Sequence, residues 1–146
     1  MADTPARSLT LAALLAAFPG SMDENIETVT RLTRAAAVEG ADVVLPPELF
    51  CGPYFCKTQD EAHFALAWPI SVHAAIGPRR ALAADLGVVI PVSVFERDGP
   101  HTYNSVVMID SGGAILGTYR KSHIPDGPGY QEKFYFRPGD TGFRVW

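Results

Sequence analysis

The chain of 146 residues has only two cysteines, no surplus of basic residues and no hydrophobic run long enough to cross a bilayer. Two cysteines cannot form a disulfide framework, and so few in an acidic chain are typical of the reducing cytosol. Twelve basic against sixteen acidic residues give a net charge of −4, which argues against a nucleic-acid partner. The longest apolar run, Leu9–Phe18, is shorter than the roughly 18 residues of a membrane helix. We therefore expect a cytoplasmic protein that binds neither membranes nor nucleic acids.

The run Leu9–Phe18 has two interpretations. It follows Arg7 and ends in small residues, as the apolar region of a secretory signal does. Asp3 offsets the charge of Arg7, however, and no clear Ala-x-Ala cleavage site is present. We favour a buried first strand over Leu9–Ala13, and the secretory signal is the alternative.

The first part of the chain predicts two parallel strands joined by a helix. After the strand Leu9–Ala13, apolar residues recur at steps of three, three and four, which is a helical spacing. Ser21 or Asp23 is placed to cap this helix, and Gly40 is placed to end it. The strand Ala41–Leu45 then stops at two prolines, so the order favours a right-handed crossover. The apolar helix residues are Ile26, Val29, Leu32 and Ala36.

Two further helices are expected before the next strand. Thr58 and Glu61 have the spacing of a capping box, which predicts a helix that ends at Trp68 and Pro69. A second helical stretch follows, and Gly87 is placed to stop it.

The next elements are predicted to be strands. β-Branched residues favour a strand over Val88–Phe95, in which Pro91 should mark an edge or a bulge. Two more strands, Tyr103–Asp110 and Ala114–Tyr119, flank a Ser-Gly-Gly sequence that is typical of a hairpin turn.

The last part of the chain is mostly loop, from Lys121 to Gly142. Phe143–Trp146 then alternates like the opening of a strand, without a turn or cap after it. Because turn or cap residues end every earlier element, we infer that residues 1–146 are a single α/β domain cut short inside a larger unit.

The patterns of common cofactor sites are missing. No glycine-rich loop with dinucleotide or phosphate spacing follows a strand. The four histidines lack the spacing of metal ligands, and Cys51 and Cys56 are five positions apart rather than three. We expect neither a cofactor nor a metal.

Three residues are candidates for acid–base chemistry. Glu48 follows a strand that should be buried on both faces, and ligands of parallel sheets gather at that edge, where a carboxylate can act as a general base. Lys121 opens the long loop, where an ammonium could stabilise an oxyanion. Glu132 lies among aromatic residues. Taken singly, each also fits a structural role: a solvated loop glutamate, an exposed basic pair with Arg120, and a packed loop.

Two local sequences favour the catalytic interpretation when they are taken together. Leu45–Phe50 resembles the motif around the catalytic glutamate of the nitrilase superfamily of carbon–nitrogen hydrolases, and Tyr119–Pro125 resembles the motif around its catalytic lysine. Tyr103-Asn104-Ser105 falls where that family has its hairpin. Within the superfamily, Gly52–Cys56 and the run from His123 to Gly142 resemble the group of N-carbamoylputrescine amidases. The resemblance extends from about Ser8 to Trp146.

The resemblance implies a nitrilase-type α-β-β-α sandwich, of which this chain would form about the first half. It also implies a thiol hydrolase with a Glu-Lys-Cys triad that uses no metal or organic cofactor. Glu48 would be the base, Lys121 would stabilise the tetrahedral intermediate, and Glu132 would position the lysine and the substrate. The products of N-carbamoylputrescine would be putrescine, carbon dioxide and ammonia, in polyamine biosynthesis. The complete protein is expected to be a homo-oligomer.

The substrate is a small molecule, and its distal ammonium needs an acidic or aromatic partner. On chemical grounds, the candidates are Tyr54, Asp126 and Tyr130.

The chain departs from the family at its nucleophile. The catalytic cysteine of the family follows a strand beyond the matching segment, and neither Cys51 nor Cys56 falls at that position. We therefore predict that the chain alone is inactive and poorly soluble. Two alternatives stay open: a hydrolase of another N-carbamoyl compound, an amide or a nitrile, and a non-catalytic fragment that pairs with a complete subunit.

Overall fold

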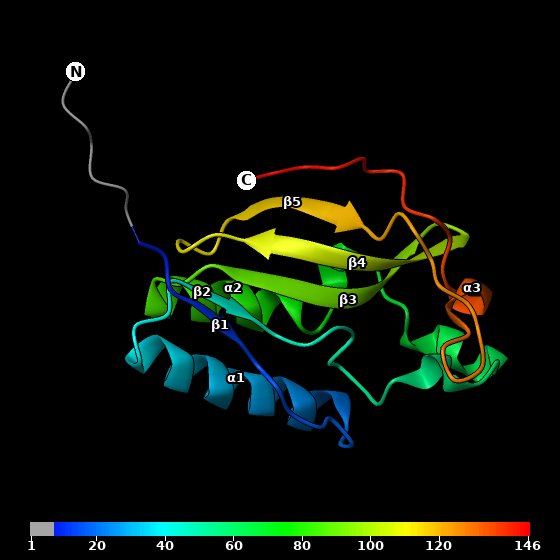
Figure 1. Cartoon of the computed structure of the whole chain (residues 1–146), viewed down its shortest axis with the longest axis horizontal. Coiled ribbons are helices and arrows are strands. Elements are labelled where there is room, and N and C mark those ends of the chain that lie inside the picture. Colours follow the sequence, from blue (N-terminus) through cyan, green and yellow to red (C-terminus); the bar gives the residue numbers. More distant parts are fainter. Residues whose placement is uncertain (1–7) are drawn as a thin grey trace.

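The computed structural model describes residues 8–146, and Figure 1 shows its strands β1 to β5 side by side, with the helices α1 and α2 against them. Asp3 and Arg7, which bear on the secretory-signal interpretation, lie outside the described residues. Within residues 8–146, every helix falls short of the length and apolarity that a membrane crossing requires.

Five strands follow one another in space in the order of the chain. β1 and β2 are parallel, as predicted, and β3, β4 and β5 form two antiparallel hairpins. A parallel bridge between Val43 and Val89 joins β2 to the residues that lead into β3. The strands are β1 (Leu11–Ala13), β2 (Val43–Leu45), β3 (Ile90–Asp98), β4 (His101–Ile109) and β5 (Ile115–Arg120).

Local sequence predicts the start and end of the helix α1 (Met22–Val38) and the end of the helix α2 (Ile76–Leu86). Ser21 caps α1 in a capping box with Glu24, because each side chain accepts a hydrogen bond from the other's backbone N–H. Gly87, at φ +68°, ends α2 in the left-handed conformation that glycine adopts easily.

The buried stripe of α1 is rotated from the predicted one. Its deepest residues are Asn25, Val29 and Thr33, whereas Leu32 is only half-buried. Burial of the two polar residues is tolerated because both are hydrogen bonded: Asn25 donates to the carbonyls of Phe18 and Gly20, and Thr33 donates to the carbonyl of Val29.

The helix predicted from Thr58 is wrong. The chain forms short 3₁₀ turns instead, and Asp60 rather than Thr58 caps the longest of them. The cause is a distant residue: the hydroxyl of Tyr135 donates to the carbonyl of Thr58 and accepts from the N–H of Asp60. The turns are η1 (Phe55–Lys57), η2 (Glu61–Leu66) and η3 (Ile70–Val72).

Residues beyond β5 include one helical turn, α3 (Glu132–Tyr135), within the predicted loop. The expected strand at Phe143–Trp146 does not form. The ring of Phe143 stacks on Tyr119, and the indole of Trp146 lies over Gly117, so side-chain packing replaces strand pairing there.

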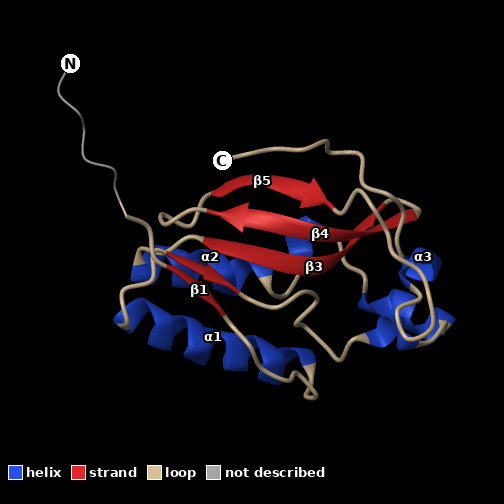
Figure 2. Cartoon of the chain, in the orientation of Figure 1, coloured by secondary structure: helices blue, strands red, loops and turns tan. Residues whose placement is uncertain are grey.

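The two faces of the sheet differ in what covers them. Alternate residues of β3 and β4 pack with α1 and α2 in the main core (Figures 1 and 2). The opposite face carries Ser93, Asn104 and Val106 and lines an open cleft. The core residues are Ile90, Val92, Val94, Val107 and Ile109.

Pro91 is tolerated within β3 because its nitrogen, like that of Val89, points away from β4, so no hydrogen bond between β3 and β4 is lost.

Candidate active site

Glu48 is held at the rim of the sheet by the residue that follows it. Leu49 has φ +52°, which no other non-glycine residue between 8 and 146 matches with a positive value. Its N–H donates to Ser93 Oγ on β3 at 2.9 Å, and its side chain is buried among aromatic residues. Packing thus maintains an unfavourable backbone conformation next to Glu48, as is common at functional sites.

Lys121 is fixed through its backbone on both sides. Its N–H donates to the carbonyl of Asn104 at 2.8 Å, and its carbonyl accepts from the N–H of Gly139 at 2.8 Å. A Cβ at Gly139 would collide with the carbonyl of Arg120, so only glycine permits this close approach. The backbone of Lys121 is therefore held in place, while its long side chain stays flexible.

Glu132 is the first residue of α3, and its side chain is only 4% exposed. Both carboxylate oxygens are hydrogen bonded: Oε1 accepts from the hydroxyl of Tyr54 at 2.7 Å, and Oε2 accepts from Lys121 Nζ at 2.8 Å. A buried carboxylate needs such partners to remain charged.

The structure brings Glu48, Lys121 and Glu132 into one cluster. Besides its bond to Glu132, Lys121 Nζ donates to Glu48 Oε1 at 3.0 Å, although these two residues are 73 positions apart. The Glu48 side chain is 47% exposed and the Lys121 side chain 29% exposed, so the cluster opens towards solvent at Glu48. Tyr54, a candidate for substrate binding, contacts this cluster through Glu132.

Asn104 belongs to the cluster, and sequence reasoning gave it no role beyond the hairpin. Its Nδ2 donates to Glu48 Oε1 at 2.7 Å, while its carbonyl receives the N–H of Lys121. Strand alternation could have placed it on the same sheet face as Val106, but its bond to Glu48 depends on tertiary packing.

The cluster shifts the pKa values of its members. Burial alone would lower the pKa of Lys121, but the hydrogen bonds to Glu132 and Glu48 outweigh it and hold the pKa above its ordinary value. Lys121 therefore stays cationic at neutral pH. Burial, and then the hydrogen bond to the Glu132 carboxylate, raise the pKa of Tyr54, which keeps its proton as a donor.

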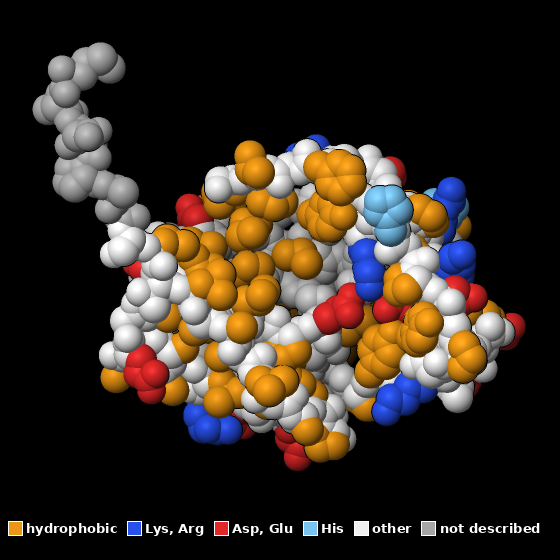
Figure 3. All heavy atoms as spheres, viewed as in Figure 1, with side chains coloured by type: hydrophobic (Ala, Val, Ile, Leu, Met, Phe, Trp, Pro, Cys, Tyr) orange, Lys and Arg blue, Asp and Glu red, His pale blue; other side chains and the backbone are white. Residues whose placement is uncertain are grey.

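An open cleft lies beside the cluster on the uncovered sheet face. In Figure 3, acidic and basic side chains meet at the edge of a hollow that hydrophobic side chains surround. Such a cleft can hold a small polar group against the cluster and an apolar chain beside it. Its lining residues are Leu45, Pro46, Glu48, Ser93, Asn104, Val106, Tyr119 and Lys121.

Neither cysteine lines this cleft. Burial raises the pKa of Cys51 to about 12. Burial, followed by the negative charge of Glu132, raises the pKa of Cys56 to about 12 as well. Both thiols stay protonated at neutral pH, whereas the nucleophilic form of cysteine is the thiolate.

Asp126 and Tyr130 are not joined to the cluster. Both are exposed, and within residues 8–146 neither side chain forms a hydrogen bond or ion pair with Glu48, Lys121 or Glu132. The ring of Tyr130 lies against Gly127 instead.

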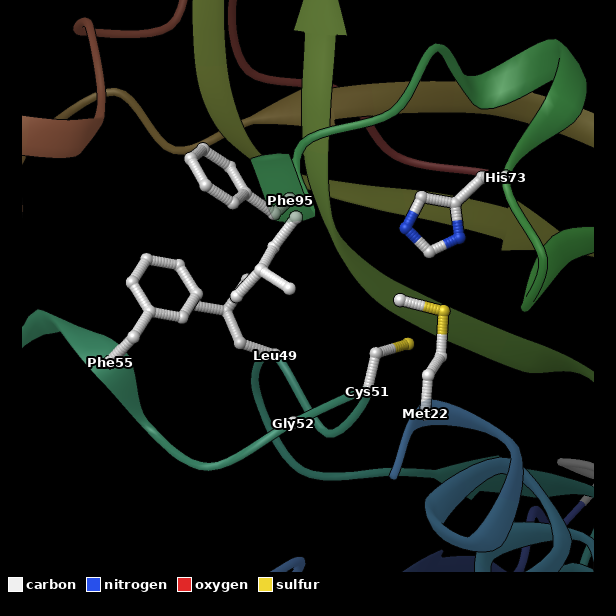
Figure 4. Close-up of a pocket in the computed structure, with 8 residues that line it drawn as sticks. Met22, Leu49, Cys51, Gly52, Phe55, His73 and Phe95 are labelled. Atoms are coloured by element: carbon white, nitrogen blue, oxygen red, sulfur yellow. The ribbon is translucent and has the colours of Figure 1, made fainter. Parts of the chain in front are cut away.

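A separate apolar cavity of about 30 Å³ is lined by Leu49, the residue after Glu48 (Figure 4). His73, Met22 and Cys51 point into it, and Leu49 forms part of its wall. Burial lowers the pKa of His73 to about 4, and its Nδ1 accepts the N–H of Ala75, so the imidazole is neutral. Among residues 8–146, no group of three or more His, Cys, Asp and Glu side chains could hold a metal ion.

Residues 10–146 match the family model described as carbon-nitrogen hydrolase. The chain belongs to this family. Its fold is that of the nitrilase superfamily: it superimposes with a TM-score of 0.85 on a carbon-nitrogen hydrolase from Helicobacter pylori G27, at 36% identity. The superposition covers 92% of this chain and 46% of that one.

The chain is also similar to two curated relatives with different names. The chain is 54% identical over 140 residues to the N-carbamoylputrescine amidase of Solanum tuberosum, covering 96% of this chain and 47% of that protein. It is 44% identical over 139 residues to the citrullinase of Francisella tularensis, covering 95% of this chain and 49% of that protein. The chain thus spans about half the length of the curated relatives it matches.

Proposed function

We propose that this chain supplies the acid–base half of a thiol hydrolase that cleaves the ureido group of N-carbamoylputrescine. The observation that carries the proposal is the position of the Lys121 ammonium, between the buried Glu132 and the partly exposed Glu48 at the edge of the cleft. Such a pair of groups can move a proton and stabilise a developing oxyanion at the same place.

The nucleophile in this proposal is a cysteine from sequence outside these 146 residues. The protonated state of Cys51 and Cys56 and the half-length match to relatives support that assignment. The isolated chain is accordingly expected to have no activity, because the covalent route needs the thiol.

The reaction proceeds in two halves around Glu48. The carboxylate takes the thiol proton as sulfur bonds to the ureido carbon, and the carbonyl oxygen becomes an oxyanion beside Lys121. The carbon–nitrogen bond to the terminal amino group breaks, and Glu48 returns the proton so that ammonia leaves. Glu48 then takes a proton from water as it attacks the carbamoyl thioester, and the thiol regains that proton. The carbamic acid released separates into putrescine and carbon dioxide.

Substrate choice is proposed from the relatives. The amidase of Solanum tuberosum and the citrullinase of Francisella tularensis are named for compounds that share a ureido group. The two names therefore agree on the group that reacts and differ in the rest of the substrate. For the distal ammonium, Tyr54, Asp126 and Tyr130 remain the candidates. Tyr54 is the only one of these three with a contact to the cluster in the described residues.

A chimera tests the proposal directly. The chain replaces the matching segment of the Solanum tuberosum enzyme, and ammonia release is measured with N-carbamoylputrescine, citrulline and a simple amide. We expect kcat/KM to be highest for N-carbamoylputrescine and no turnover by the 146-residue chain alone. A folded chimera without ureido hydrolysis would contradict the proposed function, and a preference for citrulline would reassign the substrate.

A further inference from the structure

The two carboxylates that bind Lys121 are engaged in different ways. In Glu132, each oxygen accepts one hydrogen bond, from Tyr54 and from Lys121. In Glu48, a single oxygen, Oε1, accepts from both Asn104 Nδ2 at 2.7 Å and Lys121 Nζ at 3.0 Å. Glu48 Oε2 accepts no hydrogen bond from any residue between 8 and 146.

We propose that Asn104 is a positioning residue that holds Oε1 of Glu48 and thereby reserves Oε2 as the atom that takes and returns the proton. The inference rests on the proposed function, since it assigns the base within that reaction to one oxygen. With Lys121 as its only partner, a carboxylate on a flexible side chain could present either oxygen to the ammonium. A second donor on the same oxygen removes that freedom.

Asn104 is well placed for this role because it fixes both partners. It lies on β4, is only 4% exposed, and cannot move without disturbing the hairpins on either side. Its main chain accepts the N–H of Lys121, while its side chain donates to Glu48. A side-chain substitution therefore removes the contact to the acid and keeps the backbone contact to the amine.

The proton balance uses the same atom in each step. The S–H bond breaks as an O–H bond forms at Oε2, and that proton then passes to the departing nitrogen. A water molecule next gives a proton to Oε2 as it attacks the thioester, and the thiolate recovers it when the carbon–sulfur bond breaks. No electron transfer or further reactant is required.

A double-mutant cycle in the chimera tests the role of Asn104. Asn104→Leu keeps a similar volume without a donor and should lower kcat about 10- to 100-fold, with KM changed less than about threefold. In a Glu48→Gln background, the same substitution should lower kcat less than about twofold, because the atom it positions no longer acts as a base. Asn104→Ser, which is too short to reach Oε1, repeats the cycle if the leucine variant does not fold.

Thr102→Val is the matched control. Thr102 is buried on the same strand and donates to the carbonyl of Tyr135, away from Glu48. Loss of this hydrogen bond should lower the free energy of unfolding and leave kcat unchanged. The change should be equal with Glu48 and with Glu48→Gln. Equal loss of kcat from Asn104→Leu with and without Glu48→Gln would overturn the proposed role. An inactive parent chimera would contradict the proposed function instead, so the two failures are distinguishable.

Discussion

Arg120 and Lys121, at the end of β5, point to opposite faces of the sheet, and each binds carboxylates in a cluster of charged side chains. Arg120 points to the side of the helices, where two of its nitrogens bind the two oxygens of the buried Glu96 at 2.6 and 2.9 Å. Ser105 also donates to Glu96, and the guanidinium lies 3.9 Å from the centre of the Tyr103 ring. Lys121 points to the open face and binds Glu48 and Glu132.

The difference between the clusters lies in what they leave unsatisfied. Both oxygens of Glu96 are occupied, and its side chain is 7% exposed, so this pair can only stabilise the fold. In the other cluster, Glu48 lines a cleft, and its Oε2 accepts no hydrogen bond from residues 8–146. An acid–base pair becomes chemically useful when the protein leaves one acceptor open to a substrate. Substitutions in the two clusters should therefore separate stability from activity.

The largest effect is expected from Glu48→Gln. In the chimera, kcat should fall about 10²- to 10⁴-fold, because the proposed general base is lost. The free energy of unfolding should change by less than about 1 kcal/mol, since the ion pair is partly exposed. Asp140→Asn, which removes an exposed carboxylate from the Arg120 cluster, should leave kcat unchanged. A loss of less than tenfold in the Glu48 variant would contradict its role.

Arg120→Leu should act on stability instead. It leaves the carboxylate of Glu96 buried without a cation, which costs about 3–5 kcal/mol in chemical denaturation of the chimera. Arg34→Leu is the matched control: its bond to Asp85 is also short, at 2.8 Å, but both side chains are more than half exposed. That variant should lose less than about 1 kcal/mol. Equal losses of unfolding free energy in the two variants would show that burial of Glu96 does not increase the cost of removing its cation.

The pH dependence of stability should follow His73. Its folded-state pKa is lowered to about 4, while the unfolded chain has a value near 6.5, so the unfolded state binds the proton first as pH falls. The free energy of unfolding should drop by about 2 kcal/mol between pH 7 and pH 5 from this residue. His73→Gln should flatten the profile over that range, and His123→Gln, at an exposed residue, should not. An unchanged slope in the His73 variant would refute the assignment.

The smallest effect is expected from Tyr54→Phe. The substitution removes one hydrogen bond to Glu132 and leaves its bond to Lys121, so kcat/KM should fall about tenfold. Tyr119→Phe is the comparison, because Tyr119 lines the cleft but its hydroxyl donates to Ser122 instead. If both variants lose the same activity, the contact between Tyr54 and Glu132 is not the reason.

Local sequence was sufficient for several helix ends and for the turn between β4 and β5. Ser21 begins α1 and Gly87 ends α2 as predicted, and the glycine turn after β4 forms the expected hairpin. These features depend on backbone preferences and on side chains within a few positions, which the sequence displays directly. Placement at strand ends likewise makes Glu48 and Lys121 candidates from the sequence alone.

Other features depended on residues far apart in the chain. The helix expected at Thr58 gives way to turns around Tyr135, 77 positions away. Asn104 reaches Glu48 across 56 positions and donates to the same carboxylate oxygen as Lys121. The sequence determined the five strands, the start of α1 and the end of α2, and it made Glu48 and Lys121 candidates for the acid and the amine. Only the tertiary structure decided which carboxylates Arg120 and Lys121 bind. The reason is that long-range packing, and not local preference, sets the distances between segments of the chain.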